Sequence, residues 1–357
     1  MPGHTIHVHE ARVDLNENDI IIGDVTIKPG ETISFDLPVT KLYTHTPIAI
    51  PVQVIRGKKP GPRIFVSAAI HGDEINGVEI IRRLLKQSSL KRLRGTLIAI
   101  PIVNIHGFIN HSRYLPDRRD LNRSFPGSLK GSLAARLAHL FMTEIVNQCT
   151  HGIDLHTGAI HRDNLPQIRA NLDDEETMQL AEAFGVPVLL NSDLRDGSLR
   201  ESAAQQGIPM LLYEAGEALR FDEVSIRAGV RGVTNVLRML GMLPKLSKGS
   251  KKRIEPIIAR SSAWERAPSS GIMRNAVNLG ARITKGQVLA KIADPFGQTE
   301  NEIIAQYNGI IIGKLNLPLV NEGDALFHVA RFGQVGLVEE RLEEFQELHV
   351  TEDQPLN

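Results

Sequence analysis

The sequence predicts an α/β fold, with a sheet flanked by helices, followed by a small all-β domain. Three apolar, strand-like runs, at residues 63–70, 152–153 and 209–212, each lead into polar residues that can bind or serve a metal. From residue 263 to residue 330, short β-branched runs alternate with glycines, a rhythm typical of short strands and turns. In an open α/β sheet the carboxyl ends of neighbouring strands converge on one crevice, so the polar residues are expected to meet there.

The first 40 residues are expected to form an N-terminal β segment, ahead of a catalytic domain over residues 41–253. His4, His7 and His9 alternate in a way that could hold a metal. A polar edge strand or a loose terminus is the simpler interpretation, because no other type of ligand clusters there.

The first polar segment follows the run at residues 63–70, which has the character of a buried strand. His71 and Glu74 are three positions apart, and Gly72 between them allows a sharp turn. Asn76 can cap a following helix. The apolar positions of this helix, which follow the helical period, are Val78, Ile81, Leu84 and Leu85. A turn entering a helix can aim His71 and Glu74 at one point.

The second polar segment supplies His156 as a third ligand from elsewhere in the fold. A catalytic zinc site typically uses three protein ligands and leaves the fourth position to water, and two histidines with one glutamate are a standard set. Asp154 shares a strand face with His156 and could hold the outer ring nitrogen of His156 or of His71. A buried aspartate bound by backbone amides is the alternative interpretation.

The third polar segment offers Glu214 as the base that a metal-bound water needs, since the base should lie near the metal without being consumed by it. Glu214 follows the run at residues 209–212 and precedes a glycine at which the chain can turn. A surface glutamate in a loop is the alternative interpretation.

A loop at residues 113–127, bounded by prolines and a glycine, contains four arginines. Planar guanidinium groups bind carboxylates through two parallel hydrogen bonds, so such a loop beside a metal suits an acidic substrate and a developing oxyanion. A solvated surface loop is the simpler interpretation of a charge run.

Four motifs follow one another along the chain, namely HGDE at residues 71–74, DLNRSFPG at 120–127, DLHTG at 154–158 and YEAGE at 213–217. Together they resemble the succinylglutamate desuccinylase and aspartoacylase family, a branch of the zinc carboxypeptidase-like amidohydrolases. The resemblance covers roughly residues 40–335 and implies a zinc carboxypeptidase-like mixed sheet flanked by helices. It also implies one zinc ion per chain. The ligands that it implies are His71, Glu74 and His156, with Glu214 as general base and proton shuttle.

The same resemblance assigns substrate contacts. It makes Asn122 and Arg123 the clamp for a substrate carboxylate and Arg113 the arginine that stabilises the oxyanion. Between Arg113 and the DLNR segment this chain has two more residues than aspartoacylase-like sequences, so Arg118 or Arg119 could take that role instead.

Residues 164–171 also resemble a family segment that brings an arginine, here Arg169, toward the substrate. If Arg169 reaches the pocket, a carboxylated amide becomes the favoured substrate. A surface strand is the alternative interpretation of this segment.

The implied function is hydrolysis of the amide bond of an N-acyl amino acid or a related small carboxylated amide, by desuccinylase or deacylase chemistry through a metal-activated water. A zinc carboxypeptidase acting on peptides is one alternative, and a catalytically silent binding protein on the same scaffold is another. Succinyl, aspartyl-type and acetyl amides differ only in the pocket lining, so the acyl group stays unassigned. Another divalent ion could replace zinc.

The composition is that of an ordinary globular protein, with 357 residues, 42% hydrophobic and 23% charged. The formal net charge is zero, which gives no electrostatic argument for binding nucleic acid or an anionic membrane surface. Cys149 is the only cysteine, so an intrachain disulfide is excluded and a buried hydrophobe is expected. Because the sequence contains no signal pattern and no membrane-spanning run, a cytoplasmic protein is expected. A homo-oligomer is compatible with the sequence.

The chain changes character at residues 244–253, a polar and basic stretch that suits an exposed linker, and a domain boundary is expected near Ile254. Residues 254–335 resemble the biotinyl and lipoyl carrier barrel, in which a hairpin presents a lysine. The strands expected in this domain are residues 271–272, 277–280, 286–292, 302–304, 309–312 and 323–329. The corresponding hairpin at residues 293–301 has no lysine, so the domain is expected to wall the pocket or to mediate self-association. The acidic tail at residues 336–357 is most simply a solvated helix.

Overall fold

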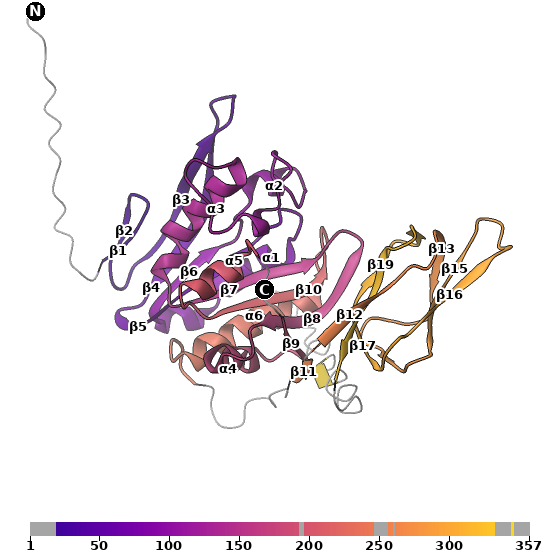
Figure 1. The fold of residues 1–357 in the computed structure, drawn as a ribbon. Coiled ribbons are helices and arrows are strands. Elements are labelled where there is room, and N and C mark those ends of the chain that lie inside the picture. The colour runs from indigo at the N-terminus through magenta and orange to yellow at the C-terminus, as the bar shows by residue number, and fades with distance from the viewer. Residues whose placement is uncertain (1–18, 193–195, 246–255, 260, 333–343, 346–357) are drawn as a thin grey trace, which may run out of the picture.

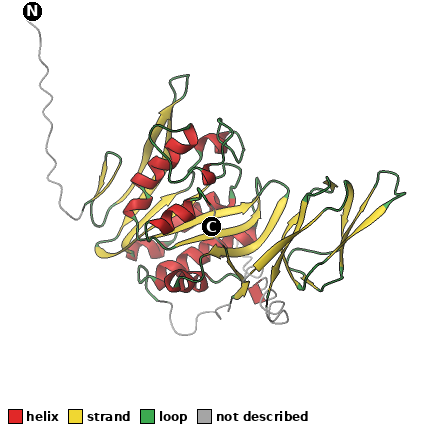
Figure 2. Cartoon of the chain, in the orientation of Figure 1, coloured by secondary structure: helices red, strands yellow, loops and turns green. Residues whose placement is uncertain are grey.

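The computed structural model describes residues 19–192, 196–245, 256–259, 261–332 and 344–345. A mixed sheet of 13 strands runs through this part of the protein. Helices cover both faces of its central region, and an all-β unit built from the C-terminal strands extends from one end (Figures 1 and 2). The predicted α/β class, with a mixed sheet flanked by helices, is confirmed.

Four parallel strands form the centre of the sheet. In spatial order they are β6 (Arg94–Ile100), β5 (Lys59–Ala68), β7 (His151–Gly158) and β10 (Met210–Glu217). Antiparallel strands extend this centre, with β4 (Pro47–Arg56) and β3 (Thr32–Lys41) beyond β6 and β8 (Arg162–Ala170) beyond β10. The three predicted strand runs coincide with parts of β5, β7 and β10. The border predicted between residues 40 and 41 falls inside β3.

Six α-helices and three short 3-10 helices pack around this centre in the described residues. The α-helices are α1 (Asn76–Leu85), α2 (Ile105–Ile109), α3 (Leu133–Glu144), α4 (Glu175–Phe184), α5 (Leu199–Gln205) and α6 (Glu223–Met239). The 3-10 helices are η1 (Ser88–Arg92), η2 (Leu121–Arg123) and η3 (Val146–Gln148). On β5, Ile64 and Val66 pack with α1, α4 and α6, whereas Phe65 packs with α3 and α5. Burial on both faces explains why β5, β6 and β10 contain uninterrupted apolar runs in the sequence.

The helix predicted after Glu74 is present as α1, but the capping role predicted for Asn76 is wrong. Ile75 occupies the N-cap position and makes no side-chain cap. Asn76 is buried instead, and its Nδ2 donates to the Ala215 carbonyl at 3.2 Å while its Oδ1 accepts from the Asp222 N–H at 3.1 Å. Asn76 thus fastens the start of α1 to Ala215 in β10 and to Asp222 at the start of α6, a contact between segments far apart in sequence.

The C-terminal unit contains two sheets that enclose one hydrophobic core, as predicted for an all-β domain. The strands that belong to the large sheet are β12 (Ser261–Arg266), β14 (Arg282–Ile283), β17 (Gly309–Leu315) and β19 (Ala325–Arg331). A separate sheet contains β13 (Gly271–Asn275), β15 (Val288–Ala293), β16 (Glu300–Ile304) and β18 (Leu319–Val320). The strand predicted at residues 277–280 is wrong, because these residues form a bend and a turn in which Gly280 has a φ of 81°. The likeness to a carrier barrel stays a prediction.

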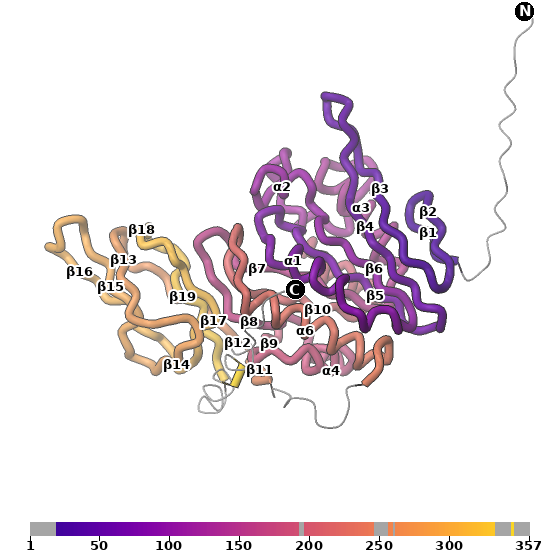
Figure 3. The backbone as a smooth tube through the Cα atoms, turned by 180° about the vertical axis from the view of Figure 1, so that it is seen from behind, coloured from indigo at the N-terminus to yellow at the C-terminus, as the bar shows by residue number. Residues whose placement is uncertain are grey.

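One strand pairing joins the C-terminal unit to the helix-flanked sheet, as the view from behind shows (Figure 3). β17 runs antiparallel to β8, with Gly313 opposite Asn164, Lys314 opposite Asp163 and Leu315 opposite Arg162. A second connection runs through β11 (Ile257–Ala259), which pairs with β9 (Val188–Asn191) and through it with β8. At the other end, β1 (Ile20–Ile22) and β2 (Val25–Ile27) form a small separate sheet.

Several predictions concern residues outside the described ranges, namely the boundary near Ile254, nearly all of the acidic tail, and the metal or edge-strand alternatives for His4, His7 and His9. Cys149 is buried as predicted, and burial raises the pKa of its thiol to about 12. None of the described helices is both long enough and apolar enough to cross a membrane.

Candidate metal centre

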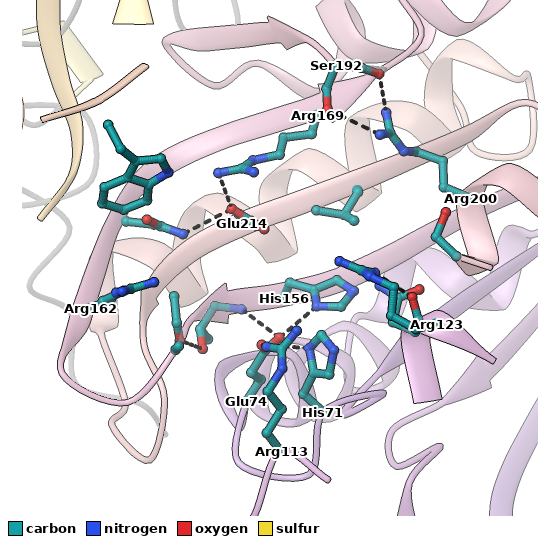
Figure 4. Close-up of a pocket in the computed structure, with 18 residues that line it drawn as sticks. His71, Glu74, Arg113, Arg123, His156, Arg162, Arg169, Ser192, Arg200 and Glu214 are labelled. Atoms are coloured by element: carbon teal, nitrogen blue, oxygen red, sulfur yellow. Dashed lines mark hydrogen bonds and ion pairs between the residues drawn. The ribbon is translucent and has the colours of Figure 1, made fainter. Parts of the chain in front are cut away.

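The three predicted ligands meet at the carboxyl ends of β5 and β7 (Figure 4). His71 and Glu74 lie in the loop between β5 and α1, and His156 lies near the end of β7. Within the described part of the chain, they form the one group of His, Cys, Asp or Glu side chains that could hold a metal ion. All three are buried, and their ligand atoms lie within 4.8 Å of one another.

Glu74 lies between the two imidazoles. Its Oε1 is 2.7 Å from Nδ1 of His71, and its Oε2 is 2.7 Å from Nδ1 of His156. The two rings meet edge to face, with centroids 5.0 Å apart. Two imidazole nitrogens and one carboxylate are a set that catalytic zinc sites use. The side chains therefore fit a single zinc ion in type, number and spacing.

Two aspartates hold the opposite nitrogens of these rings. Oδ1 of Asp120 is 3.0 Å from Nε2 of His71, and Oδ2 of Asp154 is 2.6 Å from Nε2 of His156. The hydroxyl of Ser67 donates to the other oxygen of Asp154 at 2.8 Å. Carboxylates in this position fix the orientation of ligating histidines. Asp154 contacts His156, one of the two partners predicted for it, whereas Asp120 is a partner of His71 that sequence reasoning missed.

The electrostatics of this cluster favour positive charge between its members. Burial opposes protonation of the imidazoles, but the neighbouring carboxylates outweigh it and raise the pKa of both His71 and His156. Burial also disfavours the charged form of Glu74, yet the two imidazoles hold the pKa of its carboxyl far below its usual range. The carboxylates thus favour a cation in this cluster, and a metal ion would bind the neutral form of each imidazole in place of its proton.

Arg113 is the arginine of the predicted loop that reaches this cluster. Its Nη1 is 3.3 Å from Oε1 of Glu74, and its Nη2 is 2.9 Å from Oδ2 of Asp120. Burial disfavours the charge of Arg113, but the two carboxylates raise the pKa of its guanidinium. Arg119 has a side chain that is 63% exposed, and neither it nor Arg118 lines the pocket. Of the three arginines considered for the oxyanion, the geometry favours Arg113.

Asn122 and Arg123, the two residues expected to clamp a carboxylate, lie in η2 and line the pocket. Oδ1 of Asn122 accepts from the backbone N–H of Leu199 at 2.9 Å, at the start of α5. Nη1 of Arg123 donates to the carbonyl of Asn122. The structure thus brings both residues to the pocket and shows that Asn122 also fastens α5 beside it.

Glu214 enters the pocket from β10. It is the strand partner of His156 in the parallel pairing of β10 with β7, so the two side chains leave the sheet on the same face. Its Oε2 is 2.8 Å from Nη2 of Arg169 and 3.0 Å from Nδ2 of Asn164, both on β8. Arg169 therefore reaches the pocket rather than the outer surface, with a side chain that is 15% exposed.

Comparison with known proteins decides the family. A sequence profile described as the succinylglutamate desuccinylase/aspartoacylase catalytic domain matches residues 60–240, about half of the chain. The chain belongs to the succinylglutamate desuccinylase/aspartoacylase family.

Individual proteins are similar over most of the chain. The N-alpha-acetyl-L-2,4-diaminobutyric acid deacetylase of Halomonas elongata is 28% identical over 294 residues, covering 79% of this chain and 86% of the relative. The crystal structure of a succinylglutamate desuccinylase/aspartoacylase from Rhodobacter sphaeroides is 25% identical, with a TM-score of 0.76 and coverage of 85% of this chain and 97% of that one. The product-bound structure of the ectoine utilization protein EutE (DoeB) from Ruegeria pomeroyi is also 25% identical, with a TM-score of 0.75 and coverage of 85% and 96%.

The pocket of this desuccinylase/aspartoacylase family member has a volume of about 230 Å³. Residues in its wall that the sequence analysis did not single out include Thr157, Arg162, Ser192, Ser198, Arg200 and Trp264. Arg200 donates to the carbonyl of Ser192 at 3.0 Å and to its hydroxyl at 3.2 Å. Trp264 belongs to β12, so the C-terminal unit forms part of the pocket wall. Trp264 is the only tryptophan of the chain, a signal that could have drawn attention to it.

Proposed function

We propose that this protein is a zinc-dependent hydrolase that cleaves the amide bond of an N-acyl amino acid or a related small carboxylated amide. The observation that carries the proposal is the convergence of His71, Glu74 and His156, with Glu214 as the strand partner of His156. The pocket around them is small and rich in arginine, which suits a substrate with a carboxylate. The Halomonas relative, named as a deacetylase of an acetylated diamino acid, supports the same type of reaction.

His71, Glu74 and His156 would hold one zinc ion per chain. Bound zinc supplies a Lewis acid and lowers the pKa of a water molecule. Asp120 and Asp154 hold the two imidazoles so that both Nδ1 atoms point toward Glu74, the side on which the ion would bind.

Glu214 is the proposed base. Arg169 and Asn164 both contact its Oε2, which leaves Oε1 to accept a proton from the attacking water. The water oxygen then bonds to the acyl carbon, the C–N bond breaks, and Glu214 returns the proton to the leaving amine. The products are a carboxylic acid and a free amino acid.

The arginines and Asn122 are proposed to position the substrate. The N–H groups of Arg113, beside the metal cluster, would stabilise negative charge that develops on the acyl oxygen. Arg123 and Nδ2 of Asn122 would hold a substrate carboxylate in register for attack, and Arg169 offers a further carboxylate contact beside Glu214.

A carboxypeptidase acting on peptides fits this pocket less well. The volume of the pocket, about 230 Å³, is below the range of roughly 300–1,000 Å³ that is usual for ligand pockets. The C-terminal unit also contributes Trp264 to the wall. A small substrate is therefore favoured over a long chain, which needs an open groove.

Hydrolysis of a panel of N-acyl amino acids and short peptides by the zinc-loaded protein tests this function, with His71→Ala as the control. We expect turnover of at least one N-acyl amino acid, and loss of that turnover in the variant. Preferred turnover of peptides would favour the carboxypeptidase. One bound zinc per chain without turnover of any substrate would favour a binding protein.

A further inference from the structure

Two donors on β8 hold the carboxylate of Glu214. Nη2 of Arg169 lies 2.8 Å from Oε2 of Glu214, and Nδ2 of Asn164 donates to the same oxygen at 3.0 Å (Figure 4). Within the described residues, no recorded hydrogen bond or ion pair involves Oε1 of Glu214. A carboxylate with one oxygen held by two donors resists rotation, so its other oxygen keeps a fixed direction.

Asn164 reaches Glu214 through an irregularity in the pairing of β8 with β10. Glu214 stands opposite Gln167 and Gly216 stands opposite Asn164, so β8 has one residue more than β10 between these two pairs. Such an extra residue is a β-bulge, which changes the face to which the side chains beyond it point. Asn164 consequently lies on the same face of the sheet as Glu214, in the wall of the pocket. Regular pairing would have put Leu165 there.

The bulge has a cause in the sequence. Pro166 lies within β8, between the pairing with β10 on one side and with β17 on the other. Because proline has no N–H to donate to a ladder, inside a sheet it is confined to bulges. Leu165 packs in a hydrophobic cluster with Ile312 of β17, and Gln167 donates to the carbonyl of Ile312 at 3.3 Å. The bulge thus gives Glu214 a polar donor at a point where the regular strand would offer a leucine.

The side chain of Asn164 has little freedom to turn away. Only 7% of Asn164 is exposed. Gly313 of β17 stands opposite it on the other side of β8, with no room for a Cβ beside Oδ1 of Asn164. An ionised carboxylate can only accept hydrogen bonds, so the amide must present Nδ2 to Glu214.

We propose that Asn164 is a positioning residue for the general base. It holds Oε2 of Glu214 so that Oε1 faces the reacting water, and it affects turnover through Glu214. If Arg169 turns toward a substrate carboxylate, Asn164 still holds this oxygen. The proposal rests on the proposed function and adds a residue that lies outside the four sequence motifs.

Two replacements of different size test this role in the zinc-loaded protein. Asn164→Ala and Asn164→Leu both remove the donor. The substrates are N-acetyl-L-alanine, N-succinyl-L-glutamate and N-alpha-acetyl-L-2,4-diaminobutyrate. On the one that the wild type hydrolyses fastest, both variants should lower kcat roughly 10- to 100-fold, as expected for loss of a hydrogen bond to a charged group, with KM unchanged within about twofold. Similar losses with a smaller and a larger side chain would assign the effect to the donor and not to packing.

Asn316→Ala is the matched control. Nδ2 of Asn316 donates to Oε2 of Glu217 at 2.9 Å, so this variant removes the same type of hydrogen bond from a different glutamate. Its kcat should equal that of the wild type. Thermal unfolding and metal analysis of every variant check the fold and the zinc content. Zinc should stay at one per chain, because Asn164 is outside the group of three ligand side chains.

A double-mutant cycle with Glu214→Gln separates positioning from direct contact with the substrate. Glutamine cannot take a proton from water, so its orientation no longer matters for turnover. The double variant Asn164→Ala/Glu214→Gln should therefore have the kcat of Glu214→Gln alone, within about threefold. A residue that contacts the substrate or only supports the fold would multiply its own loss onto that of Glu214→Gln. Single-turnover measurements with excess enzyme give access to these slow rates.

Three results would overturn the positioning role while leaving the proposed function intact. They are a wild-type kcat in both Asn164 variants, a change in KM alone, and a loss that multiplies with that of Glu214→Gln. A Glu214→Gln variant with wild-type turnover, or a zinc-loaded wild type that hydrolyses no N-acyl amino acid, would instead overturn the proposed function, and the role of Asn164 with it.

Discussion

Asp120 and Asp154 bind the outer nitrogens of His71 and His156, so each imidazole presents Nδ1 toward Glu74. Replacement of either aspartate by asparagine keeps its size and removes its negative charge. Because such partners orient the ring and raise its basicity, we expect Asp120→Asn and Asp154→Asn each to weaken zinc binding roughly 10- to 100-fold. Competition titration against a zinc-binding dye measures the change.

Asp117→Asn is the control for these two variants. Asp117 lies in the same loop as Asp120, but its oxygens accept from the backbone N–H groups of Arg119 and Ala134. The zinc affinity of the Asp117→Asn variant should equal that of the wild type. Equal affinity in all three variants would mean that the aspartates do not orient zinc ligands.

Glu214→Gln changes the proposed base while keeping an oxygen that can accept from Arg169 and Asn164. The amide cannot take a proton from water, so kcat should fall by about 10²- to 10⁴-fold. Zinc should remain at one per chain, because Glu214 is outside the group of three ligand side chains. Steady-state kinetics together with metal analysis check both points, and turnover at the wild-type level would remove Glu214 from the mechanism.

Residues of the site were predictable where they end a strand or belong to a motif. The structure brings His71, Glu74 and His156 together as predicted, since β5 and β7 are parallel neighbours. Asp120 and Trp264 were not foreseen, because their positions depend on long-range packing. Asp120 is 49 residues from the ring that it contacts, and Trp264 comes from the C-terminal unit.

At the level of elements, the strand pairing of β10 becomes irregular directly after Glu214, at Ala215 and Gly216. Gly216 has a φ of 76°, and a Cβ there would lie 2.5 Å from Nδ2 of Asn76 and 3.2 Å from Cβ of Asp222. Asn76 has little room to move, because its side chain is buried and bonded to Ala215 and Asp222. Gly216→Ala should therefore destabilise the protein by at least about 2 kcal/mol and lower kcat.

Gly297→Ala separates the crowding at Gly216 from the backbone strain. Gly297 has a similar φ of 70° in the hairpin between β15 and β16, and a Cβ there meets nothing within 4 Å. Its replacement should cost about 1 kcal/mol from the left-handed backbone alone and leave activity unchanged. Chemical denaturation and kinetics of both variants measure the contrast, and equal stability losses with equal activities would contradict it.

The sequence predicted elements best where local pattern and burial agree. β5, β7 and β10 were visible as apolar runs because both faces of each strand are covered. The strand predicted at residues 277–280 was wrong because Gly280 takes a turn conformation there. The pairing of β8 with β17 was not predictable, since strand register between distant segments leaves no periodic signal in either one.

For the whole molecule, Asp163 links stability to pH at the junction between β8 and β17. Burial, together with Asp222 and Glu217, raises the pKa of its carboxyl to about 6 from an ordinary value of 3.8. The folded protein therefore holds this proton more tightly than the unfolded chain does between these two values. The contribution of Asp163 to stability falls as the pH rises through this window and is unfavourable above it.

Asp163→Asn should remove that unfavourable contribution. At about pH 8 the variant should be more stable than the wild type by about 1 kcal/mol, a figure reduced for the partial exposure of the carboxyl. Near about pH 4 the difference should be much smaller, because the folded state then binds the proton and the unfolded chain begins to bind it. Urea denaturation of both proteins at saturating zinc across this range tests the prediction, and a difference that does not change with pH would refute it.

Gly313 of β17 stands opposite Asn164, and a Cβ there would come 2.7 Å from Oδ1 of Asn164, the residue that donates to Glu214. Where β17 of the C-terminal unit pairs with β8, one small residue, Gly313, therefore lies against the side chain that donates to the proposed base. A graft of the C-terminal unit from a relative needs more than a compatible linker, because a larger residue on the incoming strand would push Asn164 away from Glu214. In a library of chimeras selected for activity, position 313 should stay glycine while exposed positions of the grafted unit vary freely.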